Sequence, residues 1–346
     1  MKGGGDGYVW DVQGLQKLFP LKAGLLQSLM GQERFVHAVN GISFKIRHAE
    51  ILGMVGESGC GKTTTGRLLV GLEEPTAGTM RFDGTDIAGL GSEELKAFRR
   101  RVQMIFQDPY ESLNPRFTVM KTVGEPLIVH SITDSIEERE KMVARALEHA
   151  ELKPASEFLH RYPHELSGGQ RQRVSVARAI VLRPEFIVAD EPVSMLDVSI
   201  RAGVMNLMLD LRDKFDLTFL FISHDVAVTR YMSDRMAVMY LGRIVEMGDT
   251  EDVIKEPLHP YTQALLSAVP APDPKHRHGR VKISGEIPSP IDLPPGCSFH
   301  PRCPYVKDIC REVTPELREI TEGHYAECHF AGELELEAAL EETTPT

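Results

Sequence analysis

The stretch from Ile51 to Val70 constrains the fold most, because it combines a strand, a glycine-rich loop and a helix in one short segment. Ile51–Val55 is an apolar run of strand length, and Gly56–Thr63 fits the pattern G-x-x-x-x-G-K-[ST] at every position. A helical pattern follows from Lys62 to Val70. Glycines let successive backbone N–H groups turn toward one centre, and the helix N-terminus adds a partial positive charge. The sequence therefore predicts a loop that binds the phosphates of a nucleotide.

The residues of this loop have separate expected tasks. Lys62 is expected to pair with the β- and γ-phosphates, and the hydroxyl of Thr63 is expected to be a ligand of Mg²⁺. The other loop residues expected to contact the nucleotide are Gly56, Glu57, Ser58, Gly59, Cys60, Gly61 and Thr64. By itself such a loop fits kinases, GTPases and ATPases alike.

A second segment places two acidic residues at the end of an apolar strand. Phe186–Ala189 is apolar, and Asp190 and Glu191 follow directly. Asp190 is expected to hold the Mg²⁺ shell, and Glu191 is expected to orient or deprotonate the attacking water. Taken alone, the pattern also fits a strand that ends in two solvated acids.

The segment Leu166–Gln170, Leu-Ser-Gly-Gly-Gln, opens a helix with a serine hydroxyl and two glycines whose N–H groups are free. It is a second anion-binding helix terminus, separate from the phosphate loop. Here the chain resembles the ATP-binding-cassette (ABC) ATPases, whose signature is Leu-Ser-Gly-Gly-Gln. In that family two cassettes dimerise head to tail, and each ATP lies between the phosphate loop of one cassette and the signature of the other. The resemblance implies nucleotide contacts from Ser167, Gly168, Gly169 and Gln170.

The remaining elements of the family follow in order along the chain. Gln107 ends a strand at the place of the glutamine loop, which touches Mg²⁺ or the attacking water and senses the transport partner. Asp197, in Ser-Met-Leu-Asp, resembles the D-loop aspartate that contacts the opposite cassette, and His224 resembles the switch histidine that contacts the γ-phosphate. The family also stacks an aromatic ring on adenine. Phe19 is our candidate and Phe35 the alternative.

The strand and helix patterns predict an α/β fold. Apolar strands that are each followed by a helix, such as Phe186–Ala189 and Leu217–Ile222, are typical of a buried parallel sheet. Met236–Tyr240 and Arg243–Glu246 are expected to pair as a hairpin. In contrast, Asn40-Gly41 is expected to interrupt a strand pattern with a turn.

The resemblance implies a P-loop NTPase cassette, in which a mixed sheet core carries an antiparallel β subdomain and an inserted α-helical subdomain. The expected ABC ATPase domain covers residues 8–256, with the helical subdomain at about 109–165, where the sequence has no convincing strand. A C-terminal extension covers 257–332 and an acidic tail covers 333–346, and we assign the tail no function.

The extension resembles that of ATPase subunits from oligopeptide, dipeptide and nickel importers. The resemblance rests on Leu258–Leu266, on Gly285–Pro290 and on Pro294–Pro304. Four cysteines follow the spacing Cys297-x5-Cys303-x6-Cys310-x17-Cys328. Four thiolates in a short segment can hold zinc or an iron–sulfur cluster. The wide spacing and the subfamily resemblance favour a [4Fe–4S] cluster.

Two alternatives for these cysteines stay open. With zinc, His300, His324 or His329 could replace a cysteine as ligand. The four could also be reduced cysteines that pack as small apolar side chains.

Composition limits the class of protein and its location. The net charge of −11 argues against a general nucleic-acid binder. No apolar run reaches the length of a membrane span, and the N-terminus lacks the apolar core of a signal peptide. We therefore expect a cytoplasmic protein, whose association with a membrane must come through a partner. The resemblance implies a peripheral protein on the cytoplasmic face of the cell membrane.

The function that the resemblance implies is that of an ATP-hydrolysing subunit that powers peptide import. Its expected partners are a second related ATPase subunit, two membrane permease subunits and an extracytoplasmic substrate-binding protein. A heterodimer is expected, and a homodimer stays open. Alternatives are the same subunit in an oligosaccharide or nickel importer, or a soluble cassette ATPase outside transport. A small-molecule kinase would leave Leu166–Gln170 unexplained.

Overall fold

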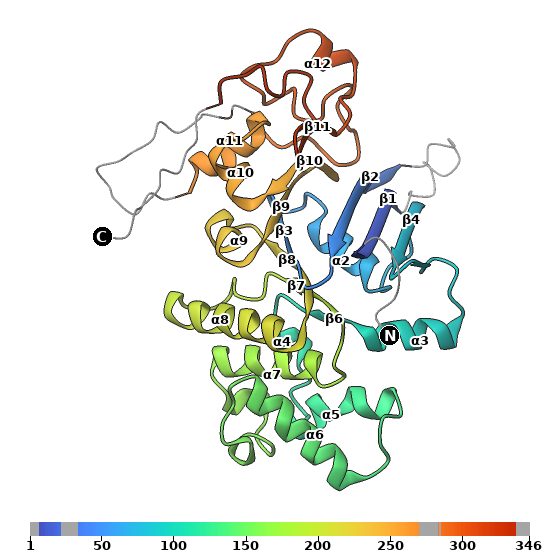
Figure 1. Cartoon of the computed structure of the whole chain (residues 1–346), viewed down its shortest axis with the longest axis vertical. Helices are drawn as coiled ribbons and strands as arrows, with labels where there is room; N and C mark the ends of the chain where they lie inside the picture. The colour runs from blue at the N-terminus through green and yellow to red at the C-terminus, as the bar shows by residue number, and fades with distance from the viewer. Residues whose placement is uncertain (1–6, 22–33, 270–282, 284, 337–346) are drawn as a thin grey trace.

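The computed structural model describes residues 7–21, 34–269, 283 and 285–336. The loop expected around Lys22 to Glu33 lies outside these ranges, as do residues 337–346 of the acidic tail. In Figure 1 the molecule is elongated, with helices α5 (Val119–Val129) and α6 (Ile136–His149) at one end and the C-terminal extension at the other.

The core is a mixed sheet with eight strands within the described residues, in the order β11-β12-β10-β9-β3-β8-β7-β6. The five strands from β9 to β6 in this order run parallel, and β10, β11 and β12 add antiparallel neighbours at one edge. The three central strands β3, β8 and β7 are buried along their whole length, as predicted for a parallel sheet. The bounds are β3 Ile51–Val55, β6 Val102–Ile105, β7 Phe186–Asp190, β8 Thr218–Ser223, β9 Arg235–Tyr240, β10 Arg243–Asp249, β11 Arg318–Thr321 and β12 His324–Ala326.

A second, antiparallel sheet has four strands within the described residues, in the order β2-β1-β4-β5. Trp10 is fully buried between the two sheets, with its ring centroid 5.1 Å from that of Phe82 and 5.6 Å from that of Phe186 in the core sheet. This aromatic contact fixes the small sheet beside the core. The bounds are β1 Tyr8–Pro20, β2 Phe35–Arg47, β4 Ala77–Phe82 and β5 Thr85–Asp86.

The turn predicted at Asn40-Gly41 is wrong, because β2 continues through it. Leu15 of β1 pairs with Ile42, whereas Gln16 pairs with Asn40, so that Gly41 is an extra residue in β2. Gly41 has a φ of 76°, a conformation that glycine adopts without strain. The two residues therefore form a β-bulge, which bends the strand without ending it.

The hairpin predicted between residues 236 and 246 is confirmed, since β9 and β10 pair antiparallel. Its two turn residues, Leu241 and Gly242, have φ values of 43° and 77°. Positive φ at both positions is typical of the tight turns that join twisted strands.

Helices cover the core sheet. The helices that lie between β6 and β7 in the sequence form a separate group. In that group the buried apolar residues of α5, α6 and α7 belong to one cluster that includes Val123, Leu147 and Val174. No helix in the described ranges is long and apolar enough to cross a membrane. The bounds of the remaining helices are α2 Lys62–Leu69, α3 Ser92–Arg101, α4 Pro109–Ser112, α7 Gly168–Ile180, α8 Val198–Phe215, α9 Val226–Met232, α10 Thr250–Lys255, α11 Pro260–Ser267 and α12 Ile309–Glu312.

The C-terminal extension is joined to the core sheet through β10. β12 pairs antiparallel with this strand. The fully buried carboxylate of Glu246 in β10 accepts hydrogen bonds from the backbone N–H groups of Leu258 and His259 and lies 2.8 Å from Nε2 of His324. A buried carboxylate needs such partners, so Glu246 ties the start and the end of the extension to the sheet.

Candidate nucleotide-binding site

The predicted phosphate loop connects β3 to α2 at the carboxyl end of the parallel strands, which is where ligands bind in open α/β sheets. The loop needs glycine at its end. Gly61 has a φ of 111°, and a Cβ atom there would lie 2.2 Å from the carbonyl oxygen of Ala38 in β2. The close approach of β2 thus leaves no room for any side chain at this position.

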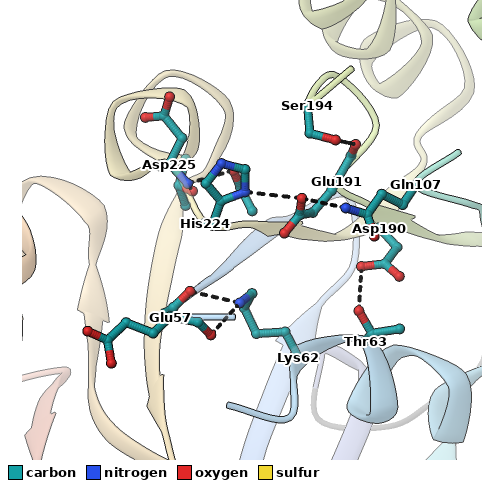
Figure 2. Close-up of polar contacts among 12 residues, drawn as sticks. Glu57, Lys62, Thr63, Gln107, Asp190, Glu191, Ser194, His224 and Asp225 are labelled. Atoms are coloured by element: carbon teal, nitrogen blue, oxygen red, sulfur yellow. Dashed lines mark hydrogen bonds and ion pairs between the residues drawn. The ribbon is translucent and has the colours of Figure 1, made fainter. Parts of the chain in front are cut away.

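Lys62 is buried and folded back onto the loop. Its Nζ donates hydrogen bonds to the carbonyl oxygens of Gly56 at 2.7 Å and of Glu57 at 3.1 Å. These carbonyl groups hold the ammonium group at the centre of the loop, as Figure 2 shows. The arrangement presents a cation beside the start of α2, where an anionic phosphate would bind.

Thr63 and Asp190 meet at the position expected for Mg²⁺. Thr63 Oγ1 donates a hydrogen bond of 3.0 Å to Asp190 Oδ1 (Figure 2). Burial raises the pKa of the Asp190 carboxyl above its ordinary value, and the hydrogen bond from Thr63 opposes this rise. A hydroxyl and a carboxylate side by side are oxygen ligands of the kind that Mg²⁺ prefers, so these two residues fit the ion.

Glu191 lies at the centre of a polar cluster. Gln107 Nε2 donates a hydrogen bond of 2.9 Å to Glu191 Oε2, and His224 Nδ1 lies 3.0 Å from the same oxygen. Glu191 has a φ of 46°, which is uncommon for a residue other than glycine. Its backbone is held by the hydrogen bond of its N–H to Ile222 of β8, while Ser194 Oγ donates to its carbonyl oxygen. The ends of β6 and β8 thus direct two side chains, those of Gln107 and His224, at one carboxylate oxygen of Glu191, which follows β7 (Figure 2).

The predicted signature starts α7. Ser167 caps the helix by accepting a hydrogen bond from the N–H of Gln170, whose side chain in turn accepts one from the N–H of Ser167. A Cβ atom on Gly169 would lie 2.5 Å from Ile200 of α8. Among the described residues, the hydrogen bonds of Ser167 join it to residues of its own helix, and none reaches the phosphate loop of the same chain.

Comparison with known proteins identifies this arrangement. Residues 39–194 match the family model described as ABC transporter, and residues 245–310 match the one described as oligopeptide/dipeptide transporter, C-terminal region. The oligopeptide transport ATP-binding protein AppF of Bacillus subtilis is 48% identical over 93% of this chain and 97% of its own length. The chain belongs to the ABC transporter ATPase family.

Other relatives agree with this assignment. The dipeptide transport ATP-binding protein DppF of Haemophilus influenzae is 46% identical to this ABC ATPase over 91% of this chain and 94% of its own length. Among solved structures, the ATP-binding cassette MJ0796 in a dimeric post-hydrolysis state with ADP and Pi is 29% identical, with a TM-score of 0.61. That match covers 70% of this chain and 98% of the other. The predicted ABC fold is thus confirmed.

The two candidate aromatic residues for adenine lie at the same end of the small sheet of this ABC ATPase. Phe19 pairs with Val36, and Phe35 pairs with Pro20, so both flank the strand segment that leads to Ala38 and the phosphate loop. Both rings are half-buried, and Lys17 Nζ lies 4.8 Å from the centroid of Phe19. Stacking on adenine stays a prediction for either residue. Asp197, predicted to contact the opposite cassette, is exposed at the N-cap of α8.

Sequence reasoning missed two residues of the extension that contact the phosphate loop. The N–H of Glu57 donates a hydrogen bond of 2.9 Å to the hydroxyl of Tyr261, and the carboxylate of Glu57 accepts two from the guanidinium group of Arg302. These partners are 204 and 245 residues from Glu57 in sequence, and no local pattern marks them.

The four cysteines of the extension line one cavity of about 10 Å³ and are free thiols. Burial raises the pKa of the thiol groups of Cys297, to about 12, and of Cys303, to about 11. Within the described ranges no group of three or more His, Cys, Asp or Glu residues is arranged to hold a metal ion. The four cysteines thus lie around one cavity.

Proposed function

We propose that this chain binds MgATP in the loop Gly56–Thr63 and hydrolyses it with Glu191 as the residue that orients or deprotonates the attacking water. The observation that carries the proposal is that Gln107 and His224 both contact the carboxylate of Glu191. A base held by two partners beside a phosphate loop fits in-line attack of water on a γ-phosphate. Thr63 and Asp190 would hold Mg²⁺, which would neutralise phosphate charge.

The site would be half of a composite site. Ser167 is exposed, and its hydrogen bonds are local, so the N-terminus of α7 is available to a second molecule. We propose that Ser167 and Gly169 of this chain complete the ATP site of a partner cassette, whose own signature completes the site here. The solved cassette with ADP and Pi is described as dimeric, which supports this arrangement.

The transport partners would dock on the helical group. An open cavity of about 660 Å³ is lined by Gln107 and by residues of α5 and α7 that include Glu125, Val129 and Arg178. Since Gln107 also contacts Glu191, a permease segment in this cavity would sense the state of the site. We propose two permease subunits, a substrate-binding protein and a second ATPase subunit as partners, which would hold the chain at the cytoplasmic face of the membrane. The boundary at residue 256, between the ABC ATPase domain and the C-terminal extension, also stays a proposal.

The test of hydrolysis compares two glutamates at opposite ends of β7. Glu191→Gln should keep MgATP affinity and lower turnover about 10²- to 10⁴-fold, the range for loss of a general base. Glu185→Gln, one residue before β7, should keep turnover near that of the wild type. Wild-type turnover by Glu191→Gln would refute the role of Glu191.

Peptides are the substrate class we propose for the assembled transporter. The names of the relatives and the match of residues 245–310 support it. Uptake of a labelled tripeptide should disappear in cells that lack this chain and return with the wild type but not with Glu191→Gln. Normal tripeptide uptake, together with lost uptake of nickel or of an oligosaccharide, would assign the chain to an alternative importer.

We further propose that the four cysteines bind a metal centre, either a [4Fe–4S] cluster or Zn²⁺. Four thiols around one cavity supply the soft donors that both centres use, and binding would require the thiols to lose protons and move together. The centre would stabilise the extension. Protein purified without oxygen should contain iron or zinc, and Cys303→Ser should lose it whereas Cys60→Ser should not. Absence of both metals from the wild type would refute the site.

A further inference from the structure

Glu57, the second residue of the phosphate loop, is held by an ion pair from the far end of the chain. Arg302 Nη1 and Nη2 donate hydrogen bonds of 2.9 and 3.1 Å to Oε2 and Oε1 of Glu57. Only 8% of the Arg302 side chain is exposed, against 27% for Glu57. A two-point pair of this kind fixes both the position and the orientation of the carboxylate. In Figure 2 this carboxylate points away from Lys62.

Arg302 is itself fixed by the fold of the extension. Backbone hydrogen bonds from His300 to Cys297 and from Arg302 to Phe299 make successive tight turns. Phe299 is buried, with its ring centroid 5.3 Å from that of Tyr240 at the end of β9 and 5.5 Å from that of Tyr261 in α11. The segment therefore rests on a buried aromatic cluster and presents Arg302 to the loop from a rigid support.

The backbone of Glu57 links this support to Lys62. The N–H of Glu57 donates to the hydroxyl of Tyr261, and the carbonyl oxygen of Glu57 accepts from Nζ of Lys62. The residue that the extension holds is thus one of the residues that position the phosphate-binding lysine. In addition, an unpaired Glu57 carboxylate in this loop would repel the phosphates of a nucleotide, because like charges at short distance disfavour binding.

We propose that Arg302 is a positioning residue of the ATP site, which neutralises Glu57 and holds the phosphate loop in the shape that binds nucleotide. Together with Tyr261 it makes the C-terminal extension part of the nucleotide site of its own chain. This inference rests on the proposed binding and hydrolysis of MgATP by the chain.

The test measures KM for ATP and kcat of the full-length protein. Arg302→Gln should raise KM about 10-fold and change kcat by less than about twofold, because the pair contributes to binding of the nucleotide and not to the chemical step. Arg302→Lys keeps the charge but loses the two-point geometry, and it should give an intermediate KM. The control is Arg101→Gln, which breaks a comparable two-point pair with Glu185 at the opposite end of the strands.

A double variant separates the effect of the unpaired Glu57 charge from general damage to the fold. If the unpaired carboxylate causes the defect of Arg302→Gln, then Glu57→Gln combined with Arg302→Gln should recover most of the lost affinity. A KM for Arg302→Gln equal to those of the wild type and of Arg101→Gln would overturn the inference while leaving the proposed function intact. A raised KM that the double variant does not recover would assign Arg302 a structural role only and would also overturn it. A wild type that binds no MgATP would overturn both proposals.

Discussion

Two glycines of the phosphate loop allow the close approach of β2 to be tested by substitution. Gly59 has a φ of 80°, and a Cβ atom there would meet nothing within 4 Å. Gly61 has a φ of 111°, and its Cβ would lie 2.2 Å from the carbonyl oxygen of Ala38 and 2.8 Å from the side chain of Met239. Both alanine variants thus suffer backbone strain, but only Gly61→Ala also collides with the backbone of a strand.

The structure sets the size of each effect. A residue with a side chain in a left-handed conformation costs about 1–2 kcal/mol, and this cost applies to both variants. The overlap with β2 should add about 1–3 kcal/mol for Gly61→Ala, the range for overpacking at a site that can shift only slightly. The free energy of unfolding should therefore fall by about 2–5 kcal/mol for Gly61→Ala and by about 1–2 kcal/mol for Gly59→Ala.

Urea unfolding of the nucleotide-free protein measures this difference. Trp10 is the only tryptophan of the sequence and lies fully buried in β1, which pairs with β2, so that its fluorescence reports on the strand that must move. The midpoint should be highest for the wild type, lower for Gly59→Ala and lowest for Gly61→Ala. Equal midpoints for the two variants would refute the close packing of the loop against β2.

Three further predictions concern the small sheet and the surface. Trp10→Ala should lower the free energy of unfolding by about 3–5 kcal/mol, measured by circular dichroism, because it empties a buried aromatic site. If Phe19 stacks on adenine, Phe19→Ala should raise KM for ATP while Phe35→Ala should not, and the reverse result would assign the stacking to Phe35. Hydrogen bonds from Arg230 lower the pKa of the Glu251 carboxyl. This pair therefore stabilises the fold at pH values above the ordinary pKa of a glutamate, and the stabilisation is lost as the pH falls through the lowered pKa of the folded state. Glu251→Gln should therefore make stability fall less between about pH 5 and pH 3, by less than about 1 kcal/mol for such an exposed pair, in acid titrations followed by circular dichroism.

The positions of the candidate nucleotide-binding residues could be predicted because these residues belong to short sequence segments. Asp190 is the last residue of the apolar strand β7, His224 follows β8 directly, and Thr63 follows β3 through the phosphate loop. Since the carboxyl ends of parallel strands meet at one edge, the order of strands alone brings such residues together. The contacts of Thr63 with Asp190 and of His224 with Glu191 agree with that expectation.

The misinterpretation of Asn40-Gly41 has a local cause. A glycine with positive φ suits both a hairpin turn and a β-bulge, and the residues themselves do not distinguish the two. The choice depends on the partner strand. β1 pairs with β2 on both sides of Gly41, and this pairing extends the strand.

The contacts of the extension could not be predicted for a different reason. Tyr261 and Arg302 are 204 and 245 residues from Glu57 in sequence, and most strands of the core sheet lie between them along the chain. Sequence periodicity reports on neighbours along one element and carries no information on such pairs. Cysteine spacing, in contrast, predicted that the four thiols come together, and all four line one cavity.

The proposed composite ATP site is tested most directly by the mass of the Glu191→Gln protein, which we expect to be deficient in hydrolysis, in sedimentation experiments with MgATP. The experiment uses the chain alone and together with any ATPase subunit that purifies with it. MgATP should convert single cassettes, of 38.6 kDa for this chain, into particles of two cassettes that retain ATP. The addition of Ser167→Arg, which blocks the start of α7, should abolish this change. Particles that retain ATP and remain single cassettes under both conditions would contradict the account.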